Sequence, residues 1–146
     1  MWRKSDATDT LNSLLRGEIS AIETYDKALA KLGENGRMAD IRRLHDDHID
    51  AADALRQHIH KHGGEPAKSS GVWGAFAKAV AGTAKLFGSA VALRALKEGE
   101  EQGIFEYENA LKDYDLPVDC KNLIETKLLP QTRAHIPVLD QLLTVA

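Results

Sequence analysis

Two stretches of the chain resemble each other closely enough to constrain the fold. Residues 11–29 read LNSLLRGEISAIETYDKAL and residues 93–111 read LRALKEGEEQGIFEYENAL, and eight of the 19 aligned positions are identical. The identities include a glutamate, Glu18 and Glu100, besides a glycine, a tyrosine and several leucines. Two unrelated amphipathic helices could share leucines by chance, but the shared polar residues favour an internal repeat.

A second pair of stretches matches more weakly. Residues 48–55 (HIDAADAL) and residues 135–142 (HIPVLDQL) share a histidine, His48 and His135, and three further residues. The offset is 87 positions here and 82 in the first pair, which a longer turn in the second half would explain. The chain is therefore predicted to contain two related helical hairpins.

Helical periodicity agrees with this division. Apolar residues recur every three or four positions in four segments, which cover residues 8–33, 36–62, 88–113 and 117–144. Short turns join the first segment to the second and the third to the fourth, so each pair is predicted to pack antiparallel. Pro130, inside the last segment, lacks an amide donor and is expected to kink or interrupt that helix.

These segments predict one all-α domain over residues 1–146, an antiparallel four-helix bundle. Its hairpins cover residues 8–62 and 88–144, and a long crossover over residues 63–87 joins them. Residues 72–85 within the crossover are rich in alanine and are predicted to form a short helix. A chain of this length can bury one core.

Charge and hydropathy exclude several classes of function. The formal net charge is −3, which gives no electrostatic basis for binding nucleic acid or an anionic membrane. The least polar stretch, residues 71–93, is interrupted by two lysines and four glycines, so no membrane span is expected. The single cysteine, Cys120, excludes an internal disulfide and fits a reducing compartment. No signal peptide is expected either, and we predict a cytoplasmic protein.

Polar residues interrupt the predicted apolar faces of all four segments. Glu18 and Glu100 lie on the leucine stripes of the first and third segments. His45 and His48 lie on the stripe of the second segment, and Thr132 and His135 lie on that of the fourth. Residues 44–50 read LHDDHID, and three aspartates of this stretch, Asp46, Asp47 and Asp50, are expected to face water.

Helix length places these polar groups near one level. At about 1.5 Å per residue, Glu18 lies roughly 22 Å before its turn and His48 roughly 18 Å after it. A buried carboxylate is costly unless it is paired or bound to a cation. A mixture of carboxylate and imidazole ligands suits zinc, iron or manganese. A metal-free network of Glu–His hydrogen bonds is the alternative that the residues leave open.

At these residues the chain resembles the ferritin-like superfamily. In that superfamily a glutamate from each of two helices and a Glu-x-x-His from each of the other two bind a di-iron or di-manganese centre. The GE…Y…AL pattern of residues 17–29 and 99–111 is similar to a bacterial family of ferritin-like four-helix-bundle proteins, described only as a domain of unknown function. The resemblance implies a ferritin-like bundle with a metal site between its helices.

The chain departs from the superfamily pattern at two positions. His45 precedes His48 by three residues and Thr132 precedes His135 by three, where the superfamily has carboxylates that bridge two metals. We therefore expect a degenerate site that holds one ion, zinc or iron, with His45 as an additional or alternative ligand. The predicted metal ligands are Glu18, His45, His48, Glu100 and His135.

Three functions follow from this interpretation. The first is metal binding, storage or stress protection through the degenerate site. The second is an oxidase or peroxidase with a di-iron or di-manganese centre, and the third is a metal-free structural or interaction bundle. The cofactor is thus one or two ions of zinc or iron, or none, and no catalytic residue is assigned. A homo-oligomer, such as a dimer, is expected, and Trp73 and Phe76 are predicted either to anchor the crossover helix or to form the dimer contact.

Two further features are predicted to have no chemistry. The histidines of HIHKH, residues 58–62, alternate by two, which spreads them around a helix, so this stretch is expected to be a solvated helix end. Cys120 has no histidine that the sequence places near it, and it is not expected to be a nucleophile.

Overall fold

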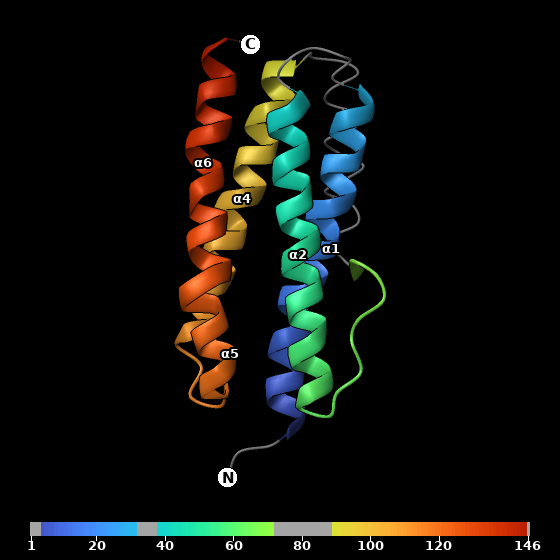
Figure 1. Ribbon diagram of the computed structural model, residues 1–146, viewed down its shortest axis with the longest axis vertical. Coiled ribbons are helices and arrows are strands. Elements are labelled where there is room, and N and C mark those ends of the chain that lie inside the picture. Colours follow the sequence, from blue (N-terminus) through green and yellow to red (C-terminus); the bar gives the residue numbers. More distant parts are fainter. Residues whose placement is uncertain (1–3, 32–37, 72–88, 146) are drawn as a thin grey trace.

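The computed structural model describes residues 4–31, 38–71 and 89–145, and this part of the chain is all helical, with no strand (Figure 1). The first hairpin consists of α1 (Lys4–Lys31) and α2 (Met38–Lys61). The third long helix is α4 (Ser89–Leu111). The fourth rod is continuous and has three parts, which are α5 (Val118–Leu123), the π-helical turn η2 (Ile124–Leu128) and α6 (Leu129–Thr144).

The four rods lie side by side around one interior. α1 packs antiparallel to α2, and α4 packs antiparallel to the α5–η2–α6 rod. The two pairs meet through contacts of α1 with α4 and of α2 with α6. α2 and α4 run in the same direction in Figure 1, so the end of α2 and the start of α4 lie at opposite ends of the bundle.

The observed helices agree with the four predicted segments to within a few residues wherever the structure describes both. α2 ends at Lys61 as expected, because Gly63 takes a positive φ of 78° and its amide donates to the carbonyl of His60. The predicted turn at residues 33–36, the short helix at residues 72–85, and the contact residues Trp73 and Phe76 lie outside the described residues.

Pro130 changes the type of helix instead of ending it. It occupies the first turn of α6, directly after the π-helical turn Ile124–Leu128. A proline inside a helix removes one amide donor, and its ring crowds the carbonyl four residues earlier. The π-helical turn, with its longer hydrogen-bond spacing, accommodates the ring so that the rod continues.

Two apolar clusters fill the interior, and one polar residue on each rod separates them. The first cluster gathers residues such as Leu15, Ala51, Tyr107 and Leu129, and the second gathers Tyr25, Leu44, Leu96 and Leu139. On each rod, one buried polar residue lies between a residue of the first cluster and a residue of the second. These four residues are Glu18, His48, Glu100 and His135. The bundle therefore carries a polar layer between two apolar layers.

None of the helices within the described residues has a stretch that is both long and apolar enough to cross a membrane.

Candidate metal centre

The polar layer consists of four side chains, one from each rod, and each is at most 5 % exposed. Glu18 comes from α1, His48 from α2, Glu100 from α4 and His135 from α6. These are four of the five residues that the sequence predicted to converge. Their burial means that every polar atom among them needs a partner inside the protein.

His48 lies between the two glutamates. Its Nδ1 is 2.6 Å from Oε2 of Glu18, and its Nε2 is 2.6 Å from Oε1 of Glu100. An ionised carboxylate only accepts hydrogen bonds, so both ring nitrogens donate. A doubly donating imidazole carries a positive charge, and His48 is thus a buried cation between two anions.

The pKa of His48 reflects this placement. Burial by itself would lower it, but the charges and hydrogen bonds of Glu18 and Glu100 outweigh burial and raise it well above 6.5. Without a metal, the ring therefore keeps its second proton at neutral pH. A metal ion that binds this ring has to displace that proton.

Glu100 is the centre of the layer because both histidines and a tyrosine donate to it. Its Oε1 accepts from His48 and from the hydroxyl of Tyr25, the latter at 2.7 Å, and its Oε2 lies 3.0 Å from Nδ1 of His135. Burial would raise the pKa of Glu100, but the two histidines outweigh it and lower this pKa from 4.5 to about 2. Glu100 is accordingly ionised at neutral pH.

Two tyrosines close the layer by reciprocal hydrogen bonds. Tyr25 on α1 donates to Glu100 on α4, and Tyr107 on α4 donates to Glu18 on α1 at 2.5 Å. Burial, and after it the adjacent carboxylates, raise the pKa of both phenols well above 10.0, so they remain protonated donors. The repeat aligned these two tyrosines; the signal for their polar role was the shared spacing of seven residues after each glutamate.

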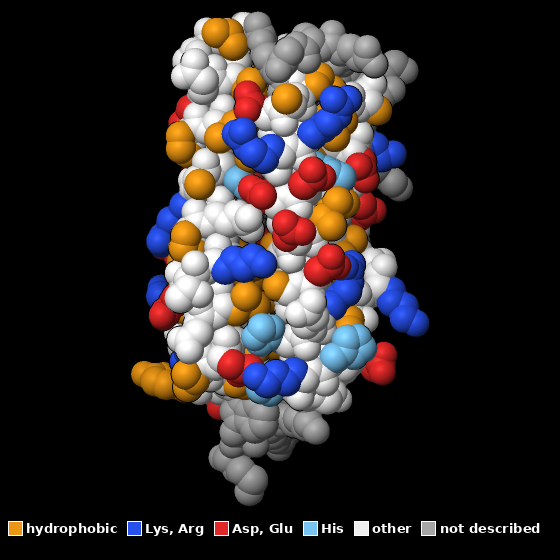
Figure 2. All heavy atoms as spheres, in the orientation of Figure 1, with side chains coloured by type: hydrophobic (Ala, Val, Ile, Leu, Met, Phe, Trp, Pro, Cys, Tyr) orange, Lys and Arg blue, Asp and Glu red, His pale blue; other side chains and the backbone are white. Residues whose placement is uncertain are grey.

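Asp47 is a partner of the polar layer that sequence reasoning missed. It was expected to face water, as Asp46 and Asp50 do; these two are exposed, and acidic side chains gather along α2 on the face seen in Figure 2. The Asp47 side chain is only 28 % exposed, and its Oδ2 lies 2.9 Å from Nε2 of His135. α2 thus contributes both a histidine and a carboxylate.

His45 does not join the layer. Leu44 takes the buried position on α2, so His45, one residue further around the helix, turns toward α1 with 16 % of its side chain exposed. Its Nε2 lies 2.8 Å from Oδ1 of the exposed Asp26, without hydrogen-bond alignment, and its Nδ1 contacts Asp46. The expectation that His45 faces inward is corrected here.

Thr132, which the sequence also placed inward, is buried, and its hydroxyl donates to the carbonyl of Leu128 on its own rod. Neither His45 nor Thr132 therefore supplies a group to the layer. His45 and Thr132 occupy the two positions that hold bridging carboxylates in the superfamily pattern, so this chain lacks both bridging groups.

Small residues on α1 and α4 leave space beside the layer. Described side chains line a cavity of about 510 Å³ whose wall includes Gly17, Ala21, Gly99 and Gly103, together with Glu18, His48 and Glu100. A Cβ atom added at Gly17 would meet nothing within 4 Å. The glycine that precedes each buried glutamate thus keeps described side chains away from one side of the carboxylates.

Three of the buried groups can converge on one cation. His48, Glu100 and His135 each offer a ligand atom, and these atoms lie within 4.8 Å of one another. The imidazole rings of His48 and His135 approach edge to face, with centroids 5.0 Å apart. Glu18 is not part of this group of three, because its contacts are to the far nitrogen of His48 and to Tyr107.

The fold and this layer define a class: an all-α protein of four helical rods with a buried layer of histidines and carboxylates. Comparison with protein families gives the particular family, since the model of a domain of unknown function, DUF2383, matches residues 6–113, and the chain belongs to it. The match covers α1, α2 and α4 and ends before the rod that carries His135. Comparisons with curated proteins and with solved structures gave no match.

Proposed function

We propose that the polar layer binds one divalent metal ion through Nε2 of His48, Nδ1 of His135 and the carboxylate of Glu100. The observation that carries the proposal is the position of Glu100, which contacts both of these nitrogens, at 2.6 and 3.0 Å. A cation that replaces the ring protons at this point meets two imidazoles and one carboxylate. Zinc and iron both accept this ligand set.

The other two carboxylates support the proposal as partners of the ligands. Glu18 contacts the far nitrogen of His48, and Asp47 contacts the far nitrogen of His135. Histidines that bind metals commonly donate their second N–H to a carboxylate, which fixes the ring and raises its basicity. In this proposal Glu18 orients a ligand, whereas the sequence predicted it to be a ligand itself.

The residues at positions 45 and 132 favour one bound ion over two. A pair of metals needs bridging carboxylates, and the corresponding positions hold His45, which faces Asp26, and Thr132, which bonds to its own backbone. A single bound ion would supply a Lewis acid beside the α1–α4 cavity. The chain's own residues hold the two rings in place and keep Glu100 ionised.

We extend the proposal to the architecture, which we describe as a ferritin-like bundle of two related hairpins. Its support is the reciprocity of the tyrosine bonds, because Tyr25 and Glu18 recur as Tyr107 and Glu100 at the same offset of 82 residues. Each histidine also turns its Nδ1 to the glutamate of its own hairpin. The parallel course of α2 and α4 requires a long crossover.

Metal analysis tests the function. Protein purified without chelator is compared with His135→Ala and His45→Ala variants, all checked for helicity by circular dichroism. We expect the His135→Ala variant to bind one equivalent less metal and the His45→Ala variant to match the wild type. Glu100→Gln, which preserves size, replaces His135→Ala if that variant does not fold. Equal metal content in all the variants would refute the proposal.

A metal-free structural role is the second candidate, and one observation favours it. Both nitrogens of His48 and both nitrogens of His135 already contact carboxylates in the absence of an ion. A protein of this kind would bind no metal in the polar layer, and added zinc would raise its melting temperature no more than that of the Glu100→Gln variant. Thermal melts of the wild type and of Glu100→Gln, with and without zinc, therefore separate the two functions.

A further inference from the structure

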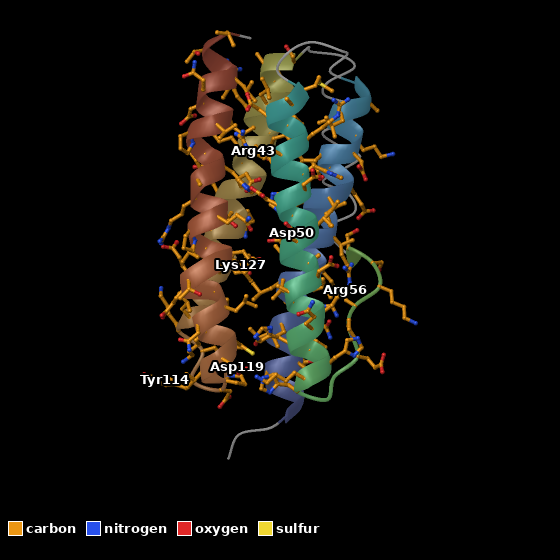
Figure 3. All side chains as sticks on the ribbon, viewed as in Figure 1. Arg43, Asp50, Arg56, Tyr114, Asp119 and Lys127 are labelled. Carbon is orange, nitrogen blue, oxygen red and sulfur yellow. The ribbon has the colours of Figure 1, made fainter. Side chains whose placement is uncertain are left out.

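A second cluster of metal-ligating side chains lies at the end of the bundle, away from the polar layer. It joins the last turns of α2 to the start of α5, where Figure 3 labels Asp119. His62, Asp119 and Cys120 each offer a ligand atom, and these atoms lie within 4.8 Å of one another. Figure 2 shows histidines beside acidic and basic side chains at this end of the molecule.

Two histidines of the cluster face the same carboxylate. Nε2 of His62 lies 3.1 Å from both carboxylate oxygens of Asp119, and Nε2 of His58 lies 3.8 Å from one of them. The sequence interpretation spread the HIHKH histidines around the helix, but His58 and His62 are four residues apart and share a face. His60, between them, is exposed.

The orientation of His58 is that of a metal ligand. Its Nδ1 lies 3.1 Å from the carbonyl oxygen of Ala54 and therefore donates to it, so the neutral ring carries its lone pair on Nε2, the nitrogen that faces Asp119. A hydrogen bond from the second ring nitrogen to a backbone carbonyl is the usual support of a metal-bound histidine. An ion pair with Asp119 would instead need a proton on Nε2.

Cys120 completes the set from inside the core. It is fully buried, and burial together with the adjacent Asp119 raises the pKa of its thiol to about 12. The thiol thus keeps its proton at neutral pH and is a poor nucleophile, although a histidine does lie near it, contrary to the sequence-based expectation. A soft divalent cation can replace that proton, which then passes to solvent.

We infer that His58, His62, Asp119 and Cys120 form a second metal site, selective for a thiol-seeking divalent cation such as zinc. Two imidazoles, one carboxylate and one thiolate give the four ligands of a structural zinc site. Lys61 donates to Asp119 at 2.9 Å in the metal-free protein, but its side chain is 63 % exposed and can turn into solvent. The bound ion would fasten the end of α2 to the start of α5.

Cobalt reports on this site separately from the polar layer, because only this site contains sulfur. The full chain, reduced and freed of metal, is titrated with Co²⁺ while its near-ultraviolet absorption is recorded. We expect a thiolate-to-cobalt charge-transfer band that zinc abolishes by displacing the cobalt. The band should be absent from the Cys120→Ser variant and should persist in the polar-layer variant Glu100→Gln.

His60, the exposed histidine between His58 and His62, provides the matched control. His62→Ala should weaken Co²⁺ binding by at least about tenfold, since even the loss of a residue that only supports a ligand costs about 10- to 100-fold. His60→Ala should leave binding unchanged. The absence of a charge-transfer band from the wild-type protein at saturating Co²⁺, or equal affinities in the His62→Ala and His60→Ala variants, would overturn the inference.

Discussion

The hydroxyl of Tyr107 on α4 donates a hydrogen bond of 2.5 Å to the carboxylate of Glu18 on α1. The same relationship runs in the opposite direction from Tyr25 to Glu100. Each tyrosine thus crosses from one hairpin to the other, and the two bonds meet at His48, which contacts both glutamates. The hairpins are joined through a charged layer as well as through their apolar clusters.

Removing either tyrosine hydroxyl should destabilise the protein. Tyr25→Phe and Tyr107→Phe each delete a hydrogen bond to a buried carboxylate, which is worth about 1.5–3 kcal/mol. The double variant should lose a different amount from the sum of the two losses, because both bonds end on glutamates that share His48. Urea denaturation measures all three, and Tyr114→Phe, at a side chain 97 % exposed, serves as the control. Wild-type stability in both single variants would contradict the network.

His48 and His45 offer a second matched comparison. His48→Ala leaves two buried carboxylates without the cation between them and should cost about 3–5 kcal/mol, as for other broken buried ion pairs. His45→Ala removes contacts with the exposed Asp26 and Asp46 and should cost less than about 1 kcal/mol. Chemical denaturation in the presence of chelator gives both values. Similar losses in the two variants would mean that both histidines serve the interior.

Stability without metal should depend on pH on both sides of a maximum. The pKa of His48 is raised above its unfolded value near 6.5, so its contribution is complete below that pH and declines as the pH rises through the folded value. The pKa of Glu100 is lowered from 4.5 to about 2, so its contribution is complete above pH 4.5 and declines as the pH falls toward 2. We expect the greatest stability between about pH 4.5 and 6.5, from urea denaturation at a series of pH values.

The alkaline side of this profile isolates His48. A His48→Gln variant retains the fold's other titrating groups but lacks the imidazolium, so its stability should change less between pH 6.5 and 9 than that of the wild type. On the acid side Asp119, whose pKa is held low by Lys61 and His62 against the opposing effect of its burial, adds its own contribution, and an Asp119→Asn variant removes it. A wild-type profile that stays flat above pH 6.5 would contradict a raised pKa of His48.

Much of the polar layer could be predicted from the sequence because it depends on helical spacing. Glu18, His48, Glu100 and His135 each occupy a position on an apolar stripe, and a stripe has to face the interior. The repeat strengthened this prediction by pairing the residues two by two. The position of a residue along a helix is thus enough to find a buried polar group.

The sequence did not predict how α2 is rotated about its axis, nor which residues on other helices its side chains contact. A period of 3.6 residues permits either Leu44 or His45 to face inward. In the folded bundle Leu44 takes the inward position, within the second apolar cluster. The same rotation brings Asp47 toward His135, a contact that depends on α6 and is invisible from α2 alone. The cluster around Asp119 was missed for a similar reason, since Asp119 lies 57 residues from His62 along the chain and the two meet only in the packed bundle.

The neighbouring aspartates Asp46 and Asp47 test the supporting role of Asp47 at the proposed metal centre. Asp47 contacts Nε2 of His135, whereas Asp46 is 74 % exposed and contacts His45. If His135 binds the ion through Nδ1, Asp47→Ala removes the carboxylate that orients the ring and should lower metal affinity about 10- to 100-fold. Asp46→Ala, which removes the same charge one residue away, should leave affinity unchanged, so long-range electrostatics alone would affect the two variants equally. Isothermal titration with zinc in a Cys120→Ser background restricts the measurement to the polar layer, and equal affinities in the two variants would exclude Asp47 from the site.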